Sequence, residues 1–171
     1  ADKKDVFKNV LGICGILMIA SKFIGVDSMA VLIVVCLIYA LANACYWQLM
    51  PSMIYDVCEV EELISGEKRS GAVISLQALS ESVSIAVGLQ MLGIILEAAG
   101  FDSDAAVQSD TALAWVENSL VVIPGAAMVC VALIMRKFTI TKELFNKVKD
   151  ALERRKRGED VSIDEYVEIF E

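Results

Sequence analysis

The sequence predicts an all-α integral membrane protein with four transmembrane helices and a short amphipathic tail. Three observations support this prediction: 57% of the 171 residues are hydrophobic, the mean hydropathy is +0.62, and four apolar runs are each long enough to cross a bilayer. About 20 residues of helix span the hydrocarbon core of roughly 30 Å. The net charge of −8 does not conflict with this class, because the acidic residues lie almost wholly outside the apolar runs.

The four apolar runs predict helices at about residues 6–26, 28–55, 71–99 and 112–135. Residues 1–138 therefore form the predicted transmembrane region, and the very short connection between the first two helices makes them an antiparallel hairpin. Pro51 lies near the end of the second run, where it removes a backbone hydrogen bond and should bend the helix. In the fourth run, Trp115 is typical of a membrane interface and Pro124-Gly125 of a kinked membrane helix.

Residues 139–171 form a predicted cytoplasmic helical tail. Its first helix, at 141–157, places four apolar residues on one face: Leu144, Phe145, Val148 and Leu152. This pattern favours a helix lying on the membrane surface, and binding to a partner is the alternative. Ser162 and Glu165 form a capping-box pattern that opens a last short helix.

The basic residues indicate how the chain is oriented. One side of the predicted membrane holds Lys3, Lys4, Lys8, Lys68, Arg69 and every basic residue from Arg136 onward. The other side has only Lys22, near a helix end where it can snorkel. The positive-inside rule therefore predicts a multi-pass protein of the cell membrane with both ends of the chain in the cytoplasm. The chain starts at Ala1, amid Asp and Lys, and we expect it to be a piece of a longer polypeptide.

A densely charged stretch, residues 56–71, connects the second and third runs. Its candidate gating residues are three acids at helical spacing, two bases and two glycines: Asp56, Glu59, Glu62, Gly66, Lys68, Arg69 and Gly71. Acids at a helix C-terminus oppose the macrodipole, so they should seek cationic partners, either these two bases or residues outside the chain. We expect a short charged hairpin that acts as an inward-side gate; an ordinary solvated turn is the alternative.

Polar and aromatic residues inside the second and third runs are the candidate substrate-binding groups. Glu81 lies ten residues into the third run, where an ionised carboxylate is costly unless it is paired or wet. It therefore indicates a solute or ion pathway, with a helix–helix hydrogen bond as the alternative. Gln77 shares its helical face. Asn43 is a weaker candidate, because a lone Asn often joins helices. Tyr46 and Trp47 form an aromatic pair that suits either the membrane interface or a stacking platform.

The sequence contains no histidine, and its five cysteines form no CxxC pair. No nucleophile motif or metal-ligand cluster is visible, so a membrane enzyme is the least favoured class. We expect neither a cofactor nor a metal site, and no nucleic-acid partner.

In the charged stretch, the sequence resembles the glycoside–pentoside–hexuronide:cation symporters, the melibiose-carrier branch of the major facilitator superfamily. That family's loop between its tenth and eleventh helices reads approximately D-x-x-D-Y-x-E-x-x-x-G-x-R-x-E-G. The matching positions here are Asp56, Glu59, Glu62, Gly66, Lys68 and Gly71. The chain departs from the pattern at Val60, where the family has Tyr, and at Ser70, where it has Glu. It also has Ser82, beside Glu81, where many members carry a Lys.

The resemblance implies that the chain corresponds to helices nine to twelve of a twelve-helix carrier. It implies symport of a sugar or glycoside with Na⁺ or H⁺, with Trp47 near the sugar. The main cation site would lie in an N-terminal helical bundle outside this chain. The implied partners are the lipid bilayer, the solute and that bundle. The alternatives are a non-transporting four-helix membrane adaptor, or a truncated symporter fragment that is inactive.

Overall fold

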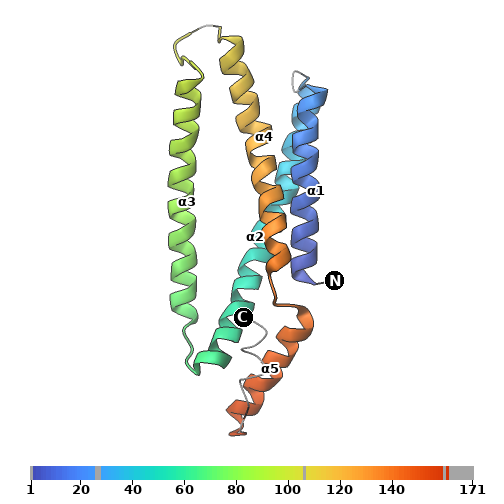
Figure 1. The fold of residues 1–171 in the computed structure, drawn as a ribbon, viewed down its shortest axis with the longest axis vertical. Helices are drawn as coiled ribbons and strands as arrows, with labels where there is room; N and C mark the ends of the chain where they lie inside the picture. Colours follow the sequence, from blue (N-terminus) through green and yellow to red (C-terminus); the bar gives the residue numbers. More distant parts are fainter. Residues whose placement is uncertain (1, 26–27, 106, 160, 162–171) are drawn as a thin grey trace.

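The computed structural model describes residues 2–25, 28–105, 107–159 and 161. Within these residues every regular element is helical: α1 (Lys3–Ile24), α2 (Met29–Ser65), α3 (Ser70–Ala98), α4 (Asp110–Ile134), the 3₁₀ turn η1 (Met135–Lys137) and α5 (Lys142–Lys156). By length and composition, four of the helices can cross a membrane. This confirms the predicted all-α membrane class. Figure 1 shows these four running along one another, with α5 beyond the end where the chain starts.

Helices α1 and α4 pack closely because two glycines meet where they cross. A Cβ added to Gly15 would lie 2.7 Å from the carbonyl oxygen of Gly125, and one added to Gly125 would lie 2.9 Å from that of Gly15. Small residues at a helix contact allow this approach of two backbones inside a membrane. The predicted kink at Pro124-Gly125 therefore has a glycine at a position where α1 leaves no room for a larger side chain.

Beyond this crossing, α1, α2 and α4 share small groups of buried apolar side chains. One group contains Phe7, Leu11, Met53 and Ala132, and another contains Met18, Val35 and Val121. Lys22, at the end of the bundle away from the chain start, has polar partners on α4. Its ammonium donates to the side-chain carbonyl of Asn118 and lies 3.8 Å from a carboxylate oxygen of Glu117.

Helix α3 stands apart from this three-helix group, as Figure 1 shows at its left. It has no buried residue. The hydroxyl groups of Ser80, Ser82 and Ser84 donate to backbone carbonyls four residues earlier, at 2.7–2.9 Å. These serines therefore satisfy their hydrogen bonds within the helix, as apolar surroundings require.

The second helix is longer than the sequence prediction, which ended it at Tyr55. Helix α2 continues to Ser65 and terminates at Gly66, whose φ of 75° suits a left-handed cap. Val60 and Leu63 recur at helical spacing and form a buried apolar face, one turn beyond the buried Asp56. That apolar face stabilises ten further residues as helix, so the predicted hairpin is reduced to the few residues between α2 and α3.

The tail helix α5 packs its apolar face on this extension of α2, and its predicted place at the membrane surface stays a prediction. Their shared cluster contains Val60, Leu63, Val148, Ala151 and Leu152. Leu63 and Val148 are each 0% exposed. The extension of α2 presents an apolar stripe that matches the apolar face of α5, so protein covers that face. The last helix predicted from Ser162 lies outside the described residues.

Candidate functional site

A cavity of about 620 Å³ lies between α3 and the group formed by α1, α2 and α4. We refer to it as the central cavity. All five candidate substrate-binding residues line it: Asn43, Tyr46, Trp47, Gln77 and Glu81. The structure thus brings together, from α2 and α3, side chains that the sequence predicts as separate candidates. Whether they bind a solute stays a prediction.

The aromatic side of the central cavity is built on α2. The rings of Tyr46 and Trp47 meet edge to face, with centroids 5.7 Å apart and planes at 85°. Phe7 from α1 supports Tyr46, at 6.4 Å between centroids. Tyr46 is half-buried, whereas Trp47 is 59% exposed. Trp47 therefore offers an accessible indole next to a ring that packing holds in place.

The polar side of the central cavity is built on α3. Glu81 is half-buried, and one of its carboxylate oxygens accepts a hydrogen bond of 3.3 Å from the amide of Gln77, one turn earlier. Ser82 does not line the cavity; its hydroxyl donates to the carbonyl oxygen of Ala78 at 2.9 Å. At this point of α3, the cavity is therefore lined by the carboxylate of Glu81.

The cavity also contains polar residues that the sequence analysis did not select. Tyr39 lines it from α2, and Ser80 and Ser84 line it from α3. Tyr39 precedes Asn43 by four residues, so one helical face carries both. The same spacing from Asn43 was a signal that could have identified Tyr39.

The predicted cationic partners of the charged stretch are corrected by the structure. Asp56 is buried, and both of its carboxylate oxygens accept hydrogen bonds from the ammonium of Lys3, at 2.8 and 2.7 Å. The partner thus comes from the start of α1. Arg69 instead binds Glu67 beside it, with its Nη2 2.7 Å from the carboxylate. Lys68 is exposed.

The other residues of the charged stretch divide between α2 and the turn that follows it. Glu59 and Glu62 are half-buried on α2, and Gly71 lies in the first turn of α3. One carboxylate oxygen of Glu59 is buried and has no hydrogen-bond partner within the described part of the chain. At the end of α2, Arg155 of α5 donates to the carbonyl oxygen of Leu63 at 3.0 Å. This cation contacts the negative end of the α2 dipole.

Comparison with known proteins identifies the family. Residues 3–142 match the family model described as MFS/sugar transport protein. Over 112 residues the chain is 27% identical to a protein named "Uncharacterized symporter sll1374" from Synechocystis sp. (strain ATCC 27184 / PCC 6803 / Kazusa). This match covers 63% of the chain and 21% of that relative, so the chain spans about a fifth of the relative's length. No solved structure matches. The chain therefore belongs to the MFS/sugar transport protein family, a family of multi-pass membrane transporters and not of enzymes.

Proposed function

We infer that the chain is the C-terminal part of a secondary active transporter that carries a sugar or glycoside together with Na⁺ or H⁺. Within the family, the charged stretch supports the glycoside–pentoside–hexuronide branch. The observation that carries the proposal is the gathering of Asn43, Tyr46, Trp47, Gln77 and Glu81 around one cavity.

The chemistry of the central cavity suits a sugar. Its volume of about 620 Å³ is within the range of small-molecule sites, which combine apolar walls with a few placed polar groups. The indole of Trp47 provides a flat apolar surface for a pyranose face. Across the cavity, the carboxylate of Glu81 accepts hydrogen bonds and the amide of Gln77 donates and accepts them. The amide of Asn43, on the same helix as Trp47, can do both as well.

The arrangement of α3 supports a second helical bundle outside this chain. A membrane helix without a buried residue, with one side on a cavity, is what remains when the helices opposite it are removed. The relative's greater length leaves room for such a bundle. We place the main cation site there, and transport proceeds by rocking of the two bundles around a solute site near the membrane midplane.

The opposite role, a membrane adaptor that uses its tail to bind partners, is less well supported. Its binding surface would be the apolar face of α5, and α2 already covers that face.

With the charged stretch on the cytoplasmic side, as the basic residues predict, the Lys3–Asp56 pair and the Arg155 contact suit an inward-side latch.

The test replaces each of the two tryptophans in the intact transporter. Trp47→Ala removes the proposed stacking surface and is expected to lower uptake at least tenfold across a panel of radiolabelled sugars and glycosides. Trp115→Ala is the matched control, because Trp115 is also partly exposed but does not line the central cavity. Normal uptake by the Trp47 variant would contradict the proposed site. An intact protein that transports no sugar under any cation gradient would contradict the proposed symport.

A further inference from the structure

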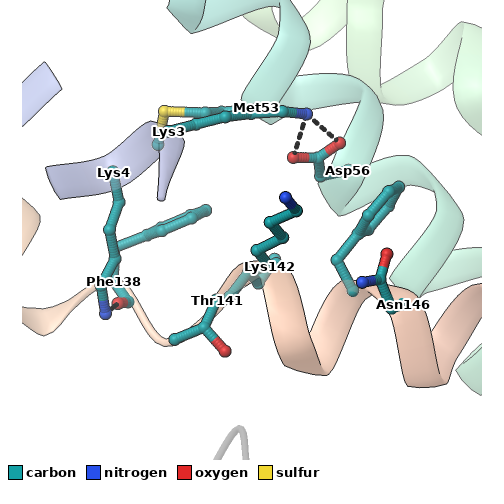
Figure 2. Close-up of a pocket in the computed structure, with 10 residues that line it drawn as sticks. Lys3, Lys4, Met53, Asp56, Phe138, Thr141, Lys142 and Asn146 are labelled. Carbon is teal, nitrogen blue, oxygen red and sulfur yellow. Dashed lines mark hydrogen bonds and ion pairs between the residues drawn. The ribbon is translucent and has the colours of Figure 1, made fainter. Parts of the chain in front are cut away.

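A second pocket, of about 330 Å³, lies where the start of α1, the extension of α2 and the connection from η1 to α5 meet (Figure 2). We refer to it as the lysine pocket. Its charged lining consists of Lys3, Lys4, Lys142 and Asp56. Its apolar lining consists of Met53, Phe138, Ile140 and Phe145. The pocket therefore has a basic side and an apolar side.

The charges of the lysine pocket do not cancel. Lys3 neutralises Asp56 through the bidentate contact drawn in Figure 2. Lys4 donates to the backbone carbonyl of Phe138 at 3.0 Å, a neutral acceptor that leaves its positive charge in place. Within the described part of the chain, the ammonium of Lys142 has no hydrogen bond or ion pair, and Figure 2 shows this side chain extending from α5 toward Asp56. Two positive charges therefore remain among the lining residues.

Neighbouring groups add to this field and partly oppose it. The N-termini of α1 and α5 both lie at the pocket, and each contributes the positive end of a helix dipole. Asp2, which does not line the lysine pocket, accepts a hydrogen bond of 3.2 Å from the backbone N–H of Lys142. Its single negative charge about cancels the two dipole ends, each roughly half a positive charge, and leaves the charges of Lys4 and Lys142 in place.

The position of the lysine pocket selects the kind of anion. The membrane-spanning helix α1 begins at Lys3, so the pocket lies where the apolar span gives way to charged residues. This is the depth of lipid headgroups, and basic pockets between membrane helices bind anionic ones. A free phosphate would leave the apolar side of the pocket unused, whereas the glycerol and upper acyl chain of a lipid would cover it.

We propose that the lysine pocket binds the phosphate of an anionic phospholipid headgroup. Lys4 and Lys142 bind the phosphate oxygens, and Phe138 and Phe145 contact the glycerol and upper acyl region. Because these two lysines belong to α1 and α5, the bound lipid joins the tail helix to the membrane bundle. This site is separate from the central cavity and does not depend on the identity of the transported solute.

The test measures lipid binding to the intact protein by native mass spectrometry, with phosphatidylglycerol and phosphatidylcholine as probes. We expect phosphatidylglycerol to be retained preferentially. Replacing two lysines, Lys4→Gln with Lys142→Gln, should weaken its binding about thirtyfold, since each cation near the surface contributes a roughly fivefold factor. Glutamine at position 4 can still donate to the carbonyl of Phe138, which preserves the fold. Lys147→Gln with Lys149→Gln is the matched control, because it removes the same charge from α5 outside the pocket.

Three outcomes would overturn the proposal. Equal loss of phosphatidylglycerol in the control pair would assign the binding to diffuse surface charge. Retention by the pocket variant would exclude the two lysines. Displacement of the lipid by millimolar inorganic phosphate would identify a site for soluble phosphate. If the double variant does not fold, the single Lys142→Gln variant replaces it. The ammonium of Lys142 makes no hydrogen bond or ion pair within the described residues, and about fivefold weaker binding is expected.

Discussion

Leu63→Ala tests whether the tail helix is held by the extension of α2. Leu63 is 0% exposed and lies in the cluster with Val148 and Leu152. Truncating a buried leucine to alanine costs about 2–5 kcal/mol, because transfer energy is lost and a cavity remains. Docking of α5 should therefore weaken by at least about thirtyfold. A separate helix of 15 residues is marginal in water, so an undocked α5 should also lose its helical hydrogen bonds.

Hydrogen exchange of the intact protein in detergent micelles measures this effect. Amide protection across α5 should fall by the same factor of about thirty or more, while protection in α1 and α4 stays unchanged. Ile64→Ala is the control, because Ile64 is 39% exposed and lies outside the cluster shared with α5. It should change protection by about twofold or less. The reasoning is refuted if α5 is equally protected in Leu63→Ala and the wild type, or if both variants lose protection equally.

Three further predictions concern the helix crossing, the central cavity and the charged pair. Gly15→Ala should destabilise the protein by about 1–3 kcal/mol, because its Cβ would lie 2.7 Å from a backbone oxygen of α4. In thermal unfolding, Gly12→Ala should be nearly neutral, since its Cβ has an ordinary contact at 3.5 Å. Glu81→Lys should shift competition uptake from cationic toward anionic sugar analogues, and unchanged selectivity would place Glu81 away from the solute. A double-mutant cycle of Lys3→Met and Asp56→Asn should give a coupling of about 1 kcal/mol, near the upper limit for partly exposed pairs. Additive effects would show that the pair adds no stability.

The sequence was sufficient for the spans and for most of the central cavity. Hydropathy locates membrane helices because the bilayer imposes their length and excludes charge. The same exclusion makes Glu81 stand out in an apolar run. Helical periodicity then relates Gln77 to it. The four-residue spacing relates Tyr39 to Asn43, but only the packing of α2 opposite α3 places that helical face at the cavity.

The sequence could not predict how the charged end is assembled. Asp56 and Lys3 are 53 residues apart, and nothing local relates them. The apolar face of α5 matches a lipid surface as well as a protein surface, so its amphipathic pattern did not distinguish between the two. The decisive factor is the continuation of α2 past Tyr55, which creates the protein surface. The charge of this stretch favours a turn and its spacing favours a helix, and the buried Val60 and Leu63 decide for the helix.

The length of α2 has a mechanical consequence. Its 37 residues, with Pro51 among them, form one unbroken helix of about 55 Å, well beyond the hydrocarbon thickness of roughly 30 Å. Because the helix is continuous, the part of α2 beyond Tyr55 moves together with the part inside the membrane. A tilt of about 10° around the middle of the membrane would displace the far end by roughly 6 Å. Helix α5, which packs on this part of α2, would move with it. Two spectroscopic labels, one on α5 and one at the start of α1, would therefore report small rotations inside the membrane as large changes in distance.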